Sequence, residues 1–253
     1  MLKISKKTII RFIWWWLVII PGIPFVLGTL GFAIYVYWPR DFSSATQFPL
    51  TRGIEYISLS AHGVKGSPAD WSDELQSLMA TNPYPQLGDI KQQNHSIDWQ
   101  EFSGNVFLCS VAGRKIGVEM GKRIAKQTSV KAIHAIGHSC GAFVVLGICE
   151  GAKSVHSQLI VQTTYLDPVS VYSGIFWDYG IEHFGSCGDF SDTYIDTRDT
   201  VPGSNQLLPN SHTTDVTPKK PTKDEHYPPH DWPTRFYIDG YKQNQVPVYY
   251  RNQ

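Results

Sequence analysis

One stretch constrains the fold of this chain more than any other, because residues 130–149 begin like a strand and end like a helix. Between the two parts lies Gly137-His138-Ser139-Cys140-Gly141, which fits the pattern G-x-S-x-G. In a nucleophile elbow the central residue is held in a strained backbone conformation at the top of a sheet, and the two glycines leave room for the turn. The hydroxyl of Ser139 would then stand at the N-terminus of the next helix, where backbone N–H groups stabilise developing negative charge.

An ordinary glycine-rich turn between a strand and a helix is the alternative to this elbow. The flanks favour the elbow, because residues 130–136 and 142–148 are rich in apolar side chains and match its strand and helix. Cys140 is a rival nucleophile. An elbow centred on Cys140 would place His138 two residues earlier, where a small residue is needed. We therefore predict that Ser139 is the nucleophile and that Cys140 contributes its backbone.

The N-terminal segment predicts a membrane anchor. Residues 12–38 carry no charge, and a helix of this length, rising about 1.5 Å per residue, crosses a hydrocarbon core. Aromatic residues at 14–16 and at 35, 37 and 38 resemble interfacial belts. Pro21 and Pro24 should kink the helix. The alternative is a cleavable signal peptide, but its apolar region would be shorter.

The charges before this apolar run predict its orientation. Four basic residues precede it: Lys3, Lys6, Lys7 and Arg11. Such a flank favours a cytoplasmic N-terminus, with the rest of the chain on the periplasmic or extracellular side. We therefore expect a signal-anchor helix in residues 1–40, a linker in 41–52 and one catalytic domain in 53–253.

Composition limits the class of partner and the redox chemistry. The 253 residues carry no net formal charge, which argues against a nucleic-acid partner, since phosphate binding needs a basic surface. Cys109 and Cys149 lie in apolar runs and are expected to be buried free thiols. A disulfide to Cys187 is the alternative in an oxidising compartment.

The region before the elbow predicts a second part of an oxyanion site. Residues 54–60 read as a buried strand that ends at His62-Gly63-Val64. Backbone N–H groups after such a strand help to form oxyanion holes, so we expect Val64 and Cys140 to supply the two donors. A plain glycine-containing loop is the alternative. Residues 67–79 are expected to form a helix.

The base and the acid should follow Ser139 in the order acid, then His. We expect His230 to be the base, because it lies after a Pro-rich loop and before a last helix-like segment; His226 and His212 are the alternatives. Asp167 ends a strand and is the preferred acid. Asp199 follows a later strand and is the alternative acid.

No cofactor or metal is expected. His226 and His230 are four residues apart, a spacing that can indicate a metal pair on a helix. Pro228 and Pro229 break any helix between them, so we predict no metal site. The aromatic segment 171–190 has two interpretations, a lid over an acyl pocket or ordinary core packing.

Several of these segments resemble the pancreatic and lipoprotein lipase family. The similar residues occur in the family's order: His62-Gly63 with Gly66 and Trp71, Ile97-Asp98-Trp99, the helix around Gly117, the elbow from 136 to 142, and Leu166-Asp167-Pro168. Residues 199–202 instead are similar to the acid segment of the fungal-type class 3 lipases. Cys140 stands where these lipases usually have Leu. The resemblance spans residues 54–237.

The resemblance implies an α/β-hydrolase fold, with a mostly parallel central sheet and helices on both faces. It also implies a Ser-His-Asp triad acting on carboxylic esters. Together with the anchor, this predicts a membrane-bound serine hydrolase for lipid or acylglycerol-type esters. An acyltransferase or a thioesterase with the same triad is an alternative, as is a non-catalytic anchored binding module.

Overall fold

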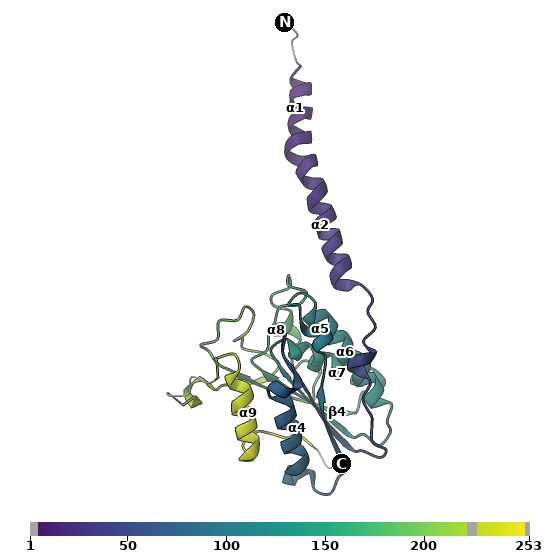
Figure 1. The fold of residues 1–253 in the computed structure, drawn as a ribbon, viewed down its shortest axis with the longest axis vertical. Helices are drawn as coiled ribbons and strands as arrows, with labels where there is room; N and C mark the ends of the chain where they lie inside the picture. The colour runs from purple at the N-terminus through teal and green to yellow at the C-terminus, as the bar shows by residue number, and fades with distance from the viewer. Residues whose placement is uncertain (1–4, 222–226, 251–253) are drawn as a thin grey trace. The chain divides into compact units, whose positions relative to one another are not determined.

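The computed structural model describes residues 5–221 and 227–250. Its chain divides into two compact units, Met1–Arg40 and Asp41–Gln253. The N-terminal unit consists of α1 (Lys6–Trp14), a π-helical turn (Trp15–Ile19) and α2 (Ile20–Tyr37) (Figure 1). The π turn precedes Pro21, which has no N–H group to donate to the carbonyl four residues earlier.

The predicted N-terminal apolar helix is confirmed as a candidate membrane span. Helix runs from Ile10 to Tyr37 over 28 residues, with a mean hydropathy of 2.2 and none of its apolar window buried by other parts of the chain. A helix of this length and composition is sufficient to cross a bilayer.

The predicted linker over residues 41–52 is corrected. These residues belong to the second unit and include α3 (Ser43–Thr46). Phe42, Ala45 and Phe48 are buried in its core, and the ring of Phe42 packs edge-on against Phe102 at 5.0 Å between centroids. Apolar burial of this kind explains why the segment folds with the second unit instead of forming a linker.

The second unit is built on a parallel sheet, as the α/β prediction requires. In the described residues six strands lie in the order β2-β1-β3-β4-β5-β6, and each neighbouring pair is parallel. The strands are β1 (Tyr56–Ala61), β2 (Gln92–Ile97), β3 (Ala132–His138), β4 (Ile160–Leu166), β5 (Phe190–Ile195) and β6 (His212–Asp215).

Helices cover both faces of this sheet (Figure 1). Within β1, Ile57 and Leu59 join one apolar cluster and Tyr56 joins the other, as the two-residue alternation of a strand requires. The first cluster contains α6 (Cys109–Ala125) and α7 (Ala142–Val155), and the second contains α4 (Ser72–Thr81) and α9 (Trp232–Lys242). The shorter helices are α5 (Gln100–Ser103), α8 (Tyr179–His183) and the 3-10 turns Pro68–Asp70, Pro85–Leu87, Ser139–Gly141 and Thr217–Lys219.

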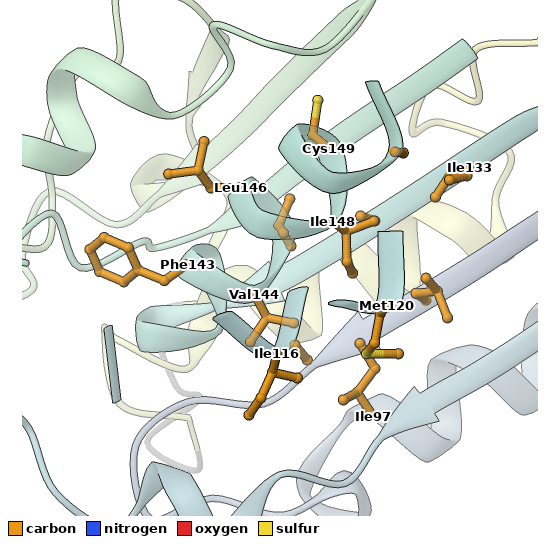
Figure 2. Packing of buried hydrophobic residues seen from close by; sticks show 14 of the residues in the cluster. Ile97, Ile116, Met120, Ile133, Phe143, Val144, Leu146, Ile148 and Cys149 are labelled. Atoms are coloured by element: carbon orange, nitrogen blue, oxygen red, sulfur yellow. The ribbon is translucent and has the colours of Figure 1, made fainter. Parts of the chain in front are cut away.

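Helices α6 and α7 pack so closely that glycines of each helix lie against the backbone of the other. A Cβ atom on Gly117 of α6 would lie 2.1 Å from the carbonyl oxygen of Val144, and one on Gly147 of α7 would lie 2.1 Å from that of Arg114. Beside these contacts, Ile116 and Met120 pack with the apolar side chains of α7 (Figure 2). This packing fixes α7, the helix that follows Ser139, against the sheet.

The expectation of buried free thiols is wrong. Cys109 is bonded to Cys140, and Cys149 is bonded to Cys187. The Cα atoms lie 6.2 and 6.1 Å apart, within the range that a disulfide spans. The first bond ties the start of α6 to the residue that follows Ser139.

Candidate active site

Ser139 lies at the end of β3 in the sharp turn that the sequence predicts. Its φ is 55°, in the left-handed region that residues with a side chain rarely adopt. A Cβ on Gly137 would lie 2.6 Å from the carbonyl oxygen of Gly141, and one on Gly141 would lie 2.4 Å from that of Ala61. The turn therefore requires glycine at both positions, and it directs the chain from β3 into α7.

The loop after β1 lies against Ser139. A Cβ on Gly63 would sit 2.9 Å from the Ser139 Cβ and 3.3 Å from its Oγ. Gly63, Val64 and Cys140 line the same cavity as Ser139. Both proposed oxyanion donors thus belong to segments that border the hydroxyl, although the two segments are 76 positions apart in the numbering of Val64 and Cys140.

His230 is held beside this turn by His138. The carbonyl oxygen of His230 lies 2.9 Å from the Nε2 atom of His138, and the two ring centroids are 4.8 Å apart. Burial lowers the pKa of His138 to about 3, so its ring is neutral near pH 7. A neutral His138 donates from Nε2–H to the carbonyl and fixes the loop that carries His230.

Both candidate acids contact the same nitrogen of His230. Asp167 follows β4 and Asp199 follows β5; their Oδ2 atoms lie 3.1 and 2.8 Å from the Nδ1 atom of His230. The two side chains meet because β4 and β5 are adjacent and parallel, so their carboxyl ends lie at one edge of the sheet. The sequence presented these carboxylates as alternatives, whereas the structure brings both to His230.

The alternative bases do not join this cluster in the described chain. His212 begins β6, is exposed and stacks on Phe190 with ring centroids 5.5 Å apart. His226 lies outside the described residues. His230 is therefore the candidate histidine that the structure places against the acids.

The electrostatics differ among the three clustered groups. Burial raises the pKa of Asp167 to about 7. Burial also acts to raise the pKa of Asp199, but hydrogen bonding from Ser204 and the charge of His230 hold it below its ordinary value. For His230, burial opposes protonation, while Asp167 and Asp199 raise the pKa above its ordinary value.

The candidate residues border a cavity of about 620 Å³. Its lining includes Ser139, His138 and His230 together with apolar side chains, among them Val64, Phe107, Val171 and Trp177. A cavity of this size is within the range of small-molecule sites. Its lining is mostly apolar around Ser139 and His230.

The aromatic segment 171–190 is divided between the core and the edge of the cavity. Tyr172, Tyr179 and Phe184 pack against Phe143 of α7, which is ordinary core packing. Ile175, Phe176 and Trp177 are exposed, with Trp177 at 55% exposure beside the cavity. Exposed apolar side chains at a cavity mouth are typical of a surface that meets an apolar ligand.

The same three groups also have the spacing of a metal site. Asp167, Asp199 and His230 each offer one ligand atom, and these atoms lie within 4.8 Å of one another. The sequence suggested a metal only at the His226 and His230 pair, so the structure adds this grouping. Three protein ligands of the His and carboxylate type are known in zinc sites.

Comparison with known proteins adds no relative. No family model matches the sequence, and no curated protein matches it either. Two features of the site had no signal in the sequence: the contact from His138 to His230, and the disulfide at Cys140, since neither depends on a local pattern.

Proposed function

We propose that the chain is a membrane-anchored serine hydrolase that cleaves carboxylic esters with apolar acyl groups. One observation carries the proposal: Ser139, in a left-handed turn, and His230, held by two carboxyl groups, line the same cavity. A hydroxyl needs a base and an orienting carboxyl group to act as a nucleophile at neutral pH.

The order of the elements supports an α/β-hydrolase fold and a likeness to lipases. The nucleophile follows β3, the acids follow β4 and β5, and the His follows β6. This is the chain order Ser, acid, His that such hydrolases use, with the nucleophile between a strand and a helix. The lipase resemblance of the motifs agrees with this order.

The proposed reaction has two stages. Ser139 Oγ attacks the ester carbonyl carbon while His230 Nε2 takes the hydroxyl proton, and the N–H groups of Cys140 and Val64 hold the oxyanion. The ester C–O bond then breaks, and His230 returns the proton to the leaving alcohol. Water next attacks the acyl-enzyme, passes a proton through His230 to Ser139 Oγ, and releases the carboxylic acid.

Apolar surface around the cavity supports a lipid-type ester as substrate. Val106 and Phe107 are 57% and 42% exposed and line the cavity together with Trp177. The N-terminal helix would place the enzyme at a bilayer, and we propose that the catalytic unit lies on its periplasmic or extracellular side. Esters with acyl chains are the substrates that such a surface and such a location favour.

A hydrolysis profile tests the proposal. The full chain in detergent is assayed with p-nitrophenyl esters of increasing acyl length, and Ser139→Ala should lower turnover by about 10⁴-fold or more. The exposed Ser157 provides a matched control, since Ser157→Ala should leave turnover unchanged. A fully active Ser139→Ala variant contradicts the proposal.

The same assay distinguishes the metal alternative. A Ser-His hydrolase keeps its activity in the presence of a strong chelator, because no step passes through a metal ion. Loss of turnover in the chelator, restored by added Zn²⁺, would instead assign Asp167, Asp199 and His230 to a metal site.

A further inference from the structure

The cluster at His230 has more acceptors than donors. Nδ1 of a neutral imidazole carries one proton, but the Oδ2 atoms of Asp167 and Asp199 lie at 3.1 and 2.8 Å from it. The two side chains are 0% and 5% exposed. If both carboxyl groups were ionised, two negative charges beside the same nitrogen would repel each other in a buried site. They would also have to share the single N–H donor of His230.

The other hydrogen bonds distinguish the two carboxyl groups. Asp199 Oδ2 accepts from the hydroxyl of Ser204, and its Oδ1 accepts from the Val201 N–H at 3.2 Å. Asp167 has the Asn205 N–H on Oδ1, also at 3.2 Å. Additional donors favour the charged form of a carboxylate, so Asp199 is the better-stabilised anion.

We propose that Asp199 is the anion that orients His230, and that Asp167 is its protonated partner and donates a hydrogen bond to Asp199. Asp167 is then a positioning residue that acts on His230 through Asp199, in addition to its own Oδ2 contact at 3.1 Å from Nδ1. The inference reverses the preference for Asp167 drawn from the sequence. It depends on the proposed function only in treating His230 as the base.

Electrostatics supports this division. Burial raises the pKa of Asp167 to about 7 against the lowering effect of His230, and the charge of Asp199 and the hydrogen bond between the two carboxyl groups also raise it. Burial acts to raise the pKa of Asp199 as well, but Ser204, His230, the Val201 N–H and Asp167 together hold it below its ordinary value. Two other groups face the cluster. His138 is neutral near pH 7 because burial lowers its pKa, and Asp231 has a raised pKa because of its own burial.

The proton on Asp167 affects how turnover depends on pH. Below its pKa, Asp167 is neutral and the cluster holds one negative charge. Above it, Asp167 ionises and a second negative charge stabilises protonated His230. The wild type should therefore lose kcat/KM on the acid side in two overlapping steps, because the two groups titrate together.

Two isosteric variants separate the roles. Asp167→Asn keeps a neutral donor to Asp199, and Asn tolerates the left-handed φ of 42° at this position. This variant should retain turnover within about 10-fold, and its acid limb should become one step at a pH lower by about one unit. Asp199→Asn removes the anion and should lower turnover by about 10⁴-fold, as for the buried Asp of a serine protease. Asp89→Asn, on an exposed loop, is the matched control.

Proton NMR of the Nδ1–H of His230 provides a readout that does not need turnover. The full chain in detergent, carrying Ser139→Ala, should show this proton far downfield. The signal should persist when Asp167→Asn is added and be lost with Asp199→Asn. If the proposed function is wrong, the wild type shows no ester hydrolysis, but the same NMR pattern is still expected from the cluster.

The opposite pattern overturns the inference. Loss of the downfield proton in Asp167→Asn with its retention in Asp199→Asn would make Asp167 the anion. Equal losses of turnover in the two variants, or an unchanged acid limb in Asp167→Asn, would also contradict it.

Discussion

At the scale of single residues, the proposed chemistry depends on Ser139 and on the small residues that make room for it. Its φ of 55° is sustained because Gly137 and Gly141 have no side chains to collide with nearby carbonyl groups. Gly63 does the same from another segment, since a Cβ there would meet the side chain of Ser139. The geometry of the hydroxyl is thus set by three glycines.

Gly63→Ala should impair catalysis more than folding. The added Cβ would lie 2.9 Å from the Ser139 Cβ, so the serine or the loop must move. A displacement of about 1 Å at a reacting group costs about 100-fold in rate. Turnover of the full chain and its thermal midpoint are measured side by side.

Gly104→Ala is the control for this change, because a Cβ on Gly104 meets no atom within 4 Å. Wild-type turnover in Gly63→Ala would show that the loop does not border the reacting hydroxyl.

The sequence anticipated most of these residues, and the reason it missed the acid pair is geometrical. Ser139 and His230 carry local signals, a motif and a position after a Pro-rich loop. Asp167 and Asp199 each had a signal, but their meeting depends on β4 and β5 being neighbours, with Leu166 opposite Tyr194. Strand order is a tertiary property that a local pattern does not contain.

At the scale of elements, buried segments were predictable and edge segments were not. Strands β1, β3 and β4 are buried along their whole length, and their apolar runs indicated them. Strands β2 and β6 lie at the two edges of the sheet and are mostly polar, so no apolar run in the sequence indicated them. An edge strand is partly solvated and needs no apolar alternation.

The α6–α7 pair supplies a stability prediction. In Gly117→Ala the new Cβ would lie 2.1 Å from the backbone oxygen of Val144, which cannot rotate away. Overpacking of this kind costs about 1–3 kcal/mol. The urea midpoint of the full chain in detergent measures the loss, with Gly104→Ala as the unstrained control. An unchanged midpoint would mean that the helices do not touch at this glycine.

The disulfide beside the turn supplies a second stability prediction. Cys109 and Cys140 are 31 residues apart in sequence, and closing a loop of that length stabilises a fold by about 3–4 kcal/mol. The variant Cys109→Ala/Cys140→Ala should lose about this much free energy of unfolding in urea. Peptide mapping without reductant should find the two wild-type cysteines linked. Unlinked cysteines in the folded wild type would remove this bond from the account.

At the scale of the whole molecule, the chain contains one apolar helical unit and one α/β unit. The helix carries exposed apolar side chains along its length, including Leu17 at 71% and Phe25 at 75%, which is unfavourable in water. The second unit has its own core, distributed over both faces of the sheet. This division agrees with the proposal that the helix anchors the chain and the second unit performs the chemistry.

The anchor is tested by extraction. The full chain should stay with membranes through an alkaline carbonate wash, because about 20 apolar residues in a helix suffice for stable insertion. A variant lacking residues 1–40 should move to the supernatant. Protease added to intact cells should degrade the catalytic unit if the N-terminus is cytoplasmic. Recovery of the full chain in the wash would contradict the membrane span.

Covalent labelling tests the central claim most directly. A fluorophosphonate probe reacts with a serine only when a base and an oxyanion site activate it. The full chain should acquire one adduct, located by peptide mapping on Ser139, and Ser139→Ala should acquire none. Folded wild-type protein that takes no label, or a Ser139→Ala variant that labels as fast as the wild type, would contradict the account.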